Sequence, residues 1–180
     1  MYFDDVLVTG KDDEEHLENL DKVLGRLATH GVKLKRAKCE FMKTSLNYLG
    51  HKIDKQGLHT DDNKVSAIRN APAPTNTKEL RSVLGLINYY NRFIPRSATL
   101  LQPMNKLLRK GVKWKWGTEC QEAFNEVKRI VSSSDVLVHY STEKPLVLAT
   151  DASDHGVGAV LSHITESGEE RPIAFASRSL

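Results

Sequence analysis

The sequence predicts an α+β protein in which two β-rich segments flank a long helical one. Residues 32–61 and 145–180 hold short apolar, β-branched runs separated by turn residues, whereas residues 62–132 repeat apolar residues at helical spacing. The 180 residues suffice for one or two domains with a real core. The 39% apolar and 27% charged content is ordinary for a globular protein.

Composition excludes several classes of protein. No apolar run approaches the ~18–20 residues of a membrane span, and the N-terminus lacks a signal-peptide pattern. The two cysteines, Cys39 and Cys120, are far apart, which argues against a cysteine-built zinc site and for a reducing compartment. Lysines and arginines concentrate in residues 32–38 and 106–115. Such clusters suit a polyanionic partner and equally suit a solvated surface.

The first 60 residues predict strands around one helix. Residues 2–8 (YFDDVLV) predict a strand, a turn and a strand. A helix follows over residues 11–31, because five apolar residues recur at helical spacing, acids fill the first turn and Gly31 is a stop signal. Residues 32–61 then predict short strands around turns, of which Gln56–Gly57 is the clearest.

Residues 61–132 predict helices. The first ends before Pro72, and a proline-rich linker leads to Asn76 and Glu79, which form a capping box. The helix that opens there runs to Pro95. We expect one further helix over residues 97–111, and another that starts at Thr118 with Gln121 completing a second capping box. Trp114 and Trp116 are predicted core anchors.

Residues 145–180 predict three strands. PLVLATDAS is a nearly continuous apolar run with an acid near its end, and HGVGAVLSHIT and RPIAFASRSL follow around the turn residues ESGEE. The resulting order is β with one helix, then helices, then β. We therefore expect two domains joined by a helical segment.

Two acidic positions are candidates for metal chemistry. Asp4 and Asp5 are adjacent, and only a turn would let both carboxylates reach one site. Two such groups stay ionised together most easily beside a divalent cation, and Mg²⁺ accepts hard oxygen ligands together with substrate phosphates. An exposed acidic turn is the simpler interpretation of this pair alone.

Asp151 raises a similar question, since a charge at the end of an apolar strand is costly unless it is solvated or liganded. Gly156 and Gly158 would leave room beside it. A turn-capping role is the simpler alternative for Asp151, and we assign Asp154 to a turn.

Read in order, the motifs YFDD, KCEF, YLGH, KELRSVLGLINYYNRFI, WKWGTECQEAF, LATDASDHGVGAVLSH and IAFASRSL resemble the polymerase polyprotein of Ty3/gypsy-type LTR retrotransposons. The resemblance covers essentially the whole chain. It implies the C-terminal part of a reverse transcriptase palm in residues 1–60, a helical thumb in 61–111, a connecting segment in 112–144, and in 145–180 the first three strands of a ribonuclease H-like mixed sheet.

The resemblance also implies functional residues. The implied catalytic and metal-binding residues are Asp4, Asp5 and Asp151. The residues implied to contact nucleic acid are Tyr2, Tyr48, Leu49, Gly50 and His51, the last four within the segment that grips the primer terminus. The implied cofactor is Mg²⁺, with Mn²⁺ as an alternative. For Tyr89, Tyr90 and Phe93, helix packing is favoured over base stacking.

The implied partners are a template–primer duplex, an RNA–DNA hybrid and deoxynucleoside triphosphates, in cytoplasmic virus-like particles that deliver DNA to the nucleus. The family's polymerase and ribonuclease H sites need further acids outside these 180 residues, so the isolated chain is expected to be inactive. A catalytically silent nucleic-acid-binding or interaction protein derived from such an element is the alternative. An unrelated metal-dependent phosphatase would use the same acids but leaves the helical segment unexplained.

Overall fold

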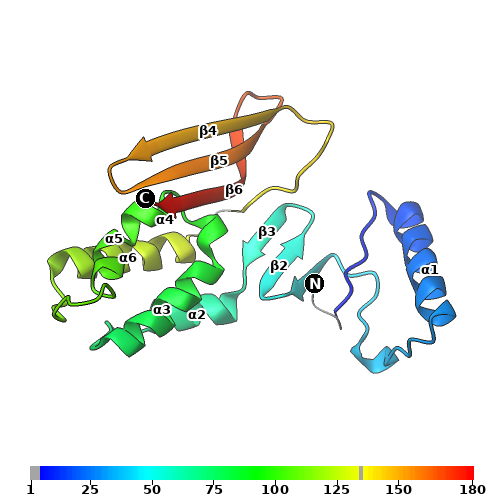
Figure 1. Cartoon of the computed structure of the whole chain (residues 1–180). Coiled ribbons are helices and arrows are strands. Elements are labelled where there is room, and N and C mark those ends of the chain that lie inside the picture. Colours follow the sequence, from blue (N-terminus) through cyan, green and yellow to red (C-terminus); the bar gives the residue numbers. More distant parts are fainter. Residues whose placement is uncertain (1–4, 134–135) are drawn as a thin grey trace.

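Two three-stranded sheets and a group of helices make up this protein, for which we use a computed structural model that describes residues 5–133 and 136–180. In Figure 1, helices α2–α6 lie below the larger sheet β4–β6 and to one side of the small sheet β1–β3, and α1 stands apart on the other side of the small sheet. The α+β class predicted from the sequence is confirmed. The elements in chain order are α1 (Asp13–Thr29), β1 (Ser45–Tyr48), β2 (His51–Asp54), β3 (Gly57–Thr60), α2 (Asp62–Asn70), α3 (Thr77–Tyr89), α4 (Ser97–Leu100), α5 (Gln102–Lys106), α6 (Thr118–Ser132), β4 (Leu146–Ser153), β5 (Gly156–Ile164) and β6 (Glu170–Ser179), with short 3₁₀ turns at Arg36–Lys38 and Asn91–Phe93.

Helix α1 forms where the sequence predicts it. The Asp12 side chain accepts a hydrogen bond from the Glu15 amide at 2.9 Å and caps the first turn. Gly31 follows the helix in the left-handed region at φ 71°, as a stop signal requires. None of the side chains of this fully described helix is buried, and Leu17 on its apolar stripe is 53% exposed.

The strand predicted for residues 6–8 is not formed: residues 5–10 have no regular secondary structure. A strand needs a neighbour that pairs with its amides and carbonyls, and this stretch has none in the part of the chain that the structure describes. Residues 1–4, where the preceding strand and half of the acidic turn were expected, lie outside the described residues.

The short strands predicted within residues 32–61 are formed, and β1, β2 and β3 pair as an antiparallel meander. The turn between β1 and β2 consists of Leu49 at φ 47° and Gly50 at φ 70°. Positive φ at both central residues is the signature of the tight hairpin turns that match strand twist. Leu49 is one of few non-glycine residues here with positive φ, so the surrounding structure must hold this turn.

The hydrophobic core lies among the helices. Its largest fully buried side chains include Tyr90, Phe124, Ile68, Leu80 and Ile87, from α2, α3, α6 and the turn after α3. Trp114 and Trp116 pack against this core, and the Trp116 indole donates to Gln121 at 2.9 Å. Both tryptophans are core anchors, as predicted.

The cap predicted at α3 is formed, with the Glu79 carboxylate reaching back to the residue before the N-cap instead of to the N-cap amide. The Asn76 side chain accepts from the Lys78 and Glu79 amides, each at 3.0 Å, and the Glu79 carboxylate accepts from the Thr75 amide at 2.8 Å. Hydrogen bonds from the Thr75 amide, the Thr75 hydroxyl and the Asn76 side chain lower the pKa of Glu79.

Two helical predictions differ from the structure. The single helix expected over residues 97–111 is two short helices, α4 and α5, because Pro103 has no amide to continue the ladder and its ring crowds the preceding turn. The second capping box is absent: the cap position of α6 is Gly117, which has no side chain, and Thr118 is already the first helical residue. The Gln121 side-chain oxygen accepts from the Trp116 indole instead.

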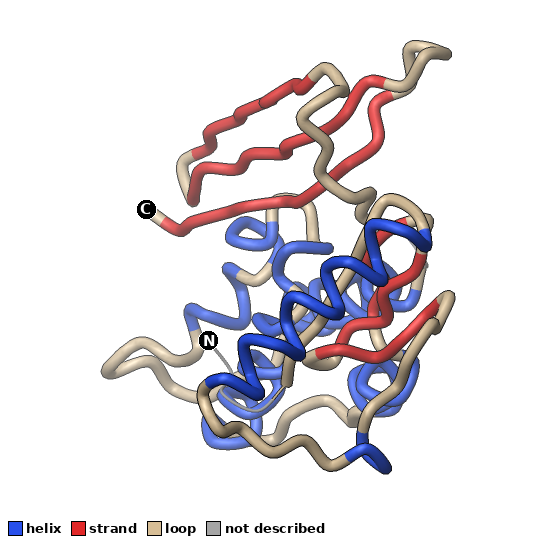
Figure 2. The backbone as a smooth tube through the Cα atoms, turned by 90° about the vertical axis from the view of Figure 1, so that its right-hand side faces the viewer, coloured by secondary structure: helices blue, strands red, loops and turns tan. Residues whose placement is uncertain are grey.

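The three strands predicted for residues 145–180 are formed: β4, β5 and β6 pair as an antiparallel meander, with a bulge at Leu161/Ser162. One face lies against the helices (Figure 2). The Ala98 amide of α4 donates to the Ser177 hydroxyl of β6 at 3.0 Å, and the Leu58↔Leu137 bridge joins the segment before β4 to the small sheet. A membrane-spanning helix is not found among the described residues.

The cap at Asn76 gives a test of the fold. We expect Asn76→Ala to lower the free energy of unfolding by about 0.5–2 kcal/mol, because two amides of the first turn lose their acceptor. Thr118→Ala is the matched control at the start of α6, where no side-chain cap exists, and should leave stability nearly unchanged. Urea unfolding measures both variants; equal losses would contradict the assignment of the cap.

Candidate functional site

The turn between β1 and β2 is held by two adjacent tyrosines at the end of α3. The Tyr89 hydroxyl donates to the Leu49 carbonyl, and the Tyr90 hydroxyl donates to the Gly50 carbonyl at 3.0 Å. Both carbonyls of the left-handed turn are therefore satisfied by side chains 40 residues further along the chain. Tyr90 is fully buried, and burial raises the pKa of its hydroxyl to about 12.

His51 follows this turn and lies in an aromatic cluster. Its ring stacks on Tyr89 at a centroid distance of 5.2 Å and on Phe93 at 5.7 Å, and it meets the edge of Tyr90 at 5.6 Å. Burial, together with the positive charges of Arg92 and Lys64, lowers the pKa of His51 below its usual 6.5. Its Nδ1 atom is buried and has no hydrogen-bond partner among residues 5–133 and 136–180, which also disfavours a charged ring.

Tyr90 and Phe93 are core residues, whereas Tyr89 lies at the edge of the core. The first two are buried in the core, as the sequence analysis favours. Tyr89 is 39% exposed; its ring stacks on His51 and also meets the ring of the buried Tyr90 edge to face, at a centroid distance of 5.1 Å. No periodicity rule separates Tyr89 from Tyr90, because the distinction comes from a contact with a distant turn.

The structure brings one candidate acidic residue near this turn. The Tyr48 hydroxyl donates to the Asp5 backbone carbonyl at 3.1 Å, so the chain at Asp5 lies beside β1. The Asp5 side chain is exposed. Tyr2 and Asp4 lie outside the described residues.

Asp151 lies on β4, directly opposite Gly158 of β5, which in turn lies opposite Ser177 of β6. Residues paired across antiparallel strands share one face of the sheet. Because Ser177 accepts from the Ala98 amide, this is the face that α4 approaches. The strand continues two residues beyond Asp151, to Ser153.

The two glycines of β5 have different roles. A Cβ at Gly156 would lie 2.7 Å from the Arg178 carbonyl oxygen and 3.0 Å from the Ala98 Cβ, so glycine permits the close approach of α4. A Cβ at Gly158 would meet its nearest atom, Arg96 Cγ, at 3.6 Å, an ordinary contact. A Cβ would therefore fit at position 158, and its absence leaves a small space on the face of the sheet that carries the exposed Asp151.

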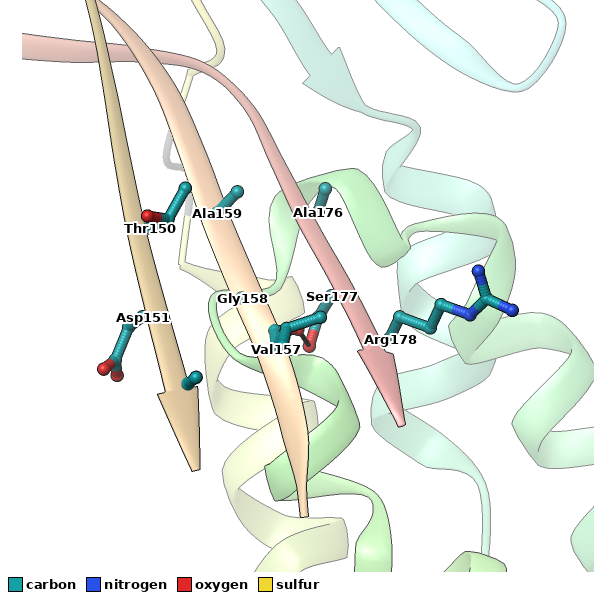
Figure 3. Close-up of a pocket in the computed structure, with 9 residues that line it drawn as sticks. Thr150, Asp151, Val157, Gly158, Ala159, Ala176, Ser177 and Arg178 are labelled. Atoms are coloured by element: carbon teal, nitrogen blue, oxygen red, sulfur yellow. Dashed lines mark hydrogen bonds between the residues drawn. The ribbon is translucent and has the colours of Figure 1, made fainter. Parts of the chain in front are cut away.

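Two shallow pockets meet at Asp151. One, of about 500 Å³, is lined by Asp151, Val157, Ser177 and neighbouring residues of the three strands. In Figure 3 the Asp151 carboxylate and the Arg178 side chain point away from each other, on opposite sides of the strands. The other pocket, of about 300 Å³, is lined by Asp151 and by Pro95 and Arg96, which precede α4. Sequence reasoning did not find Arg96, whose position depends on how α4 docks on the sheet.

The donor set at Asp151 fits part of a magnesium site. A carboxylate is a hard oxygen ligand, it is exposed, and the gap at Gly158 leaves space beside it. Within residues 5–133 and 136–180, however, no three His, Cys, Asp or Glu side chains gather in a group able to hold a metal ion. Asp5 and Asp151 are therefore separate single carboxylates in the described part of the chain. Residues 48–51 line neither pocket at Asp151, so the turn and Asp151 belong to different candidate sites.

The two ends of the chain match two known protein families. Residues 1–53 match the family described as reverse transcriptase (RNA-dependent DNA polymerase). Residues 116–180 match the RNase H-like domain found in reverse transcriptase.

Curated relatives match along nearly the whole chain. The Tf2-3 and Tf2-4 transposon polyproteins of Schizosaccharomyces pombe are each 35% identical over 179 residues, which is 99% of this chain and 13% of the relative. The chain therefore spans about an eighth of the length of these relatives.

Solved structures show the same fold. A foamy viral protease–reverse transcriptase in complex with double-stranded DNA has a TM-score of 0.77 and 26% identity over 95% of this chain and 30% of its own. The same type of protein in complex with an RNA/DNA hybrid has a TM-score of 0.74 and 26% identity over 96% of this chain and 23% of its own.

The environment of His51 predicts a dependence of stability on pH. Because its pKa is lowered on folding, the unfolded chain takes up the proton first as the pH falls. The free energy of unfolding should therefore decrease as the pH falls from 6.5 through the folded-state pKa. His51→Phe keeps an aromatic ring in the stack and should remove this component of the slope. Urea unfolding at a series of pH values measures it; an unchanged slope in His51→Phe would refute the assignment.

Proposed function

We propose that this chain, which is similar to retrotransposon polyproteins along 99% of its length and matches reverse transcriptase and RNase H-like families, is part of an enzyme that copies RNA into DNA and degrades the RNA of RNA–DNA hybrids. The similarity to transposon polyproteins over 179 residues carries this proposal, because it joins both domains in one continuous match. Template–primer duplex, RNA–DNA hybrid and deoxynucleoside triphosphates are the proposed substrates. The chain is a segment of this enzyme, consistent with its share of the relatives' length.

We assign the segments as the sequence suggests: palm in residues 1–60, thumb in 61–111, a connecting segment in 112–144 and the start of the ribonuclease H-like domain in 145–180. The two family matches, over residues 1–53 and 116–180, support a polymerase part followed by a ribonuclease H-like part. The helical core that follows the small sheet in the chain supports a thumb there, since it presents α3 to the turn of the small sheet.

In the polymerase part, Asp4 and Asp5 would hold the divalent cation, with Tyr2 beside them. Mg²⁺, or Mn²⁺ in its place, would neutralise the charge that develops on the transferred phosphate. The primer strand would be contacted by Tyr48, Leu49, Gly50 and His51. The hydrogen bond from Tyr48 to the Asp5 carbonyl supports this arrangement, because it ties the acidic segment to the strand that leads into the turn.

In the ribonuclease H-like part, Asp151 would be one ligand of the cation at the scissile phosphate. The pocket lined by Asp151, Gly158 and Arg96 would admit the phosphate next to the carboxylate. Arg96, which lines the pocket on the α4 side, would present its positive charge to the same phosphate. The backbone of β4 fixes the position of Asp151, since it pairs with β5 along its whole length.

The ribonuclease H role of Asp151 is testable in the longer polyprotein. Asp151→Asn should lower the rate of RNA cleavage in an RNA–DNA hybrid by about a hundredfold or more, because a metal ligand is lost. Asp154→Asn is the matched control: Asp154 lies in the turn after β4, and the variant should cleave at the parental rate. Equal rates for Asp151→Asn and the parent, or equal losses in both variants, would contradict the role.

The polymerase role is tested by primer extension with Mg²⁺. In the longer polyprotein, Asp4→Asn with Asp5→Asn should abolish template-dependent extension. The 180-residue chain alone should show no extension above that doubly substituted control. The reason is that its described residues contain no group of three His, Cys, Asp or Glu side chains able to hold a metal ion. Extension by the chain alone would overturn this expectation, and persistent extension by the double variant of the polyprotein would overturn the proposed role of the two acids.

A further inference from the structure

We propose that Lys64 and the turn Tyr48–His51 form a binding site for a backbone phosphate of a nucleic-acid strand, with Tyr89 holding the lysine in place. This inference rests on the proposed contact of the turn with the primer, and it adds the cation that would bind the strand there. Lys64 belongs to α2, in the helical part of the chain, whereas the turn belongs to the small sheet. The site therefore combines two segments that the sequence separates.

The Tyr89 ring positions the Lys64 ammonium over the turn. Lys64 Nζ lies 4.5 Å from the centroid of the ring, within the range of a cation–π interaction. The Tyr89 hydroxyl donates to the Leu49 carbonyl, so Tyr89 contacts both the lysine and the turn. One side chain thus fixes the lysine relative to the backbone of residues 49–50.

Glycine at position 50 makes room for the ammonium. A Cβ built on Gly50 would overlap Lys64 Nζ and the Tyr89 hydroxyl. The residue also has φ 70°, where glycine carries no steric penalty. The absence of a side chain at position 50 therefore allows both the left-handed backbone of the turn and the close approach of the Lys64 ammonium to the turn.

The charge on Lys64 is available to a ligand. The residue is exposed, and within the described ranges 5–133 and 136–180 no carboxylate lies within ion-pair distance of its ammonium. A cation–π contact orients a cation without neutralising it. Arg92 adds a second positive charge near His51, and Asp61 is the negative charge that opposes them.

A phosphodiester suits this arrangement best. An ammonium is a compact point charge that binds phosphate without demanding a planar partner. Backbone phosphates are contacted without regard to sequence, as strand-tracking by a polymerase requires. A free triphosphate shares the same chemistry, and the experiment below separates the two sources.

The salt dependence of duplex binding tests the site. The probe is a fluorescein-labelled DNA duplex with a recessed 3′ end, titrated with the 180-residue chain by anisotropy between about 50 and 200 mM salt. Lys64→Gln should reduce the slope of log Kobs against log salt by about 0.9, which is one phosphate contact. Tyr89→Leu should reduce it in the same direction, and Lys64→Arg should retain it. Lys78→Gln, an exposed lysine in the first turn of α3, is the control and should bind like the parent.

The outcomes separate this site from the proposed function. If the parent binds the duplex with a salt-dependent affinity and Lys64→Gln shows the parental slope, the site is wrong and duplex binding stands. If the parent chain does not bind the duplex, the site is wrong; the proposed function concerns the longer polyprotein and is decided separately by its primer extension. If dATP displaces the duplex from the parent but not from Lys64→Gln, the site takes a free triphosphate and the assignment to a strand phosphate is overturned. Far-UV circular dichroism and thermal unfolding show that each variant is folded.

Discussion

The buried hydroxyl of Tyr90 connects the two halves of this structure. Its ring lies in the helical core with no exposed surface, and its oxygen must find a partner there, because an unsatisfied buried hydroxyl costs on the order of 1–3 kcal/mol. The partner is the Gly50 carbonyl, in a turn that no helix contains. The position of the small sheet relative to the helices is thus coupled to the packing of the core, and Tyr89, the next residue back, repeats the connection at Leu49.

Much of the fold follows from local patterns. Asn76 and Glu79 specify the start of α3 through contacts within five residues, so the sequence alone reveals them. The similar pair Thr118 and Gln121 fails, because Gly117 takes the cap position and the glutamine accepts from the Trp116 indole instead. The break at Pro103 was present in the sequence but was outweighed by the apolar spacing around it.

The candidate sites divide in the same way. Asp151 and Gly158 could be placed together from sequence, because antiparallel neighbours joined by a short turn have a nearly fixed register. Lys64, Tyr89 and Arg96 could not, since each acquires its role from a contact between elements distant in the chain. A turn can be predicted from its own residues, but the groups that surround it depend on the tertiary fold.

Helix α1 shows what amphipathic spacing alone provides. Its apolar stripe and its caps form the helix, yet none of its side chains reaches the core. Secondary structure without such packing opens at a low free energy, far below that of the whole molecule. In amide hydrogen exchange, α1 should thus behave as a separate cooperative unit that loses protection early, while the amides of α3 and α6 exchange only when the helical core itself unfolds.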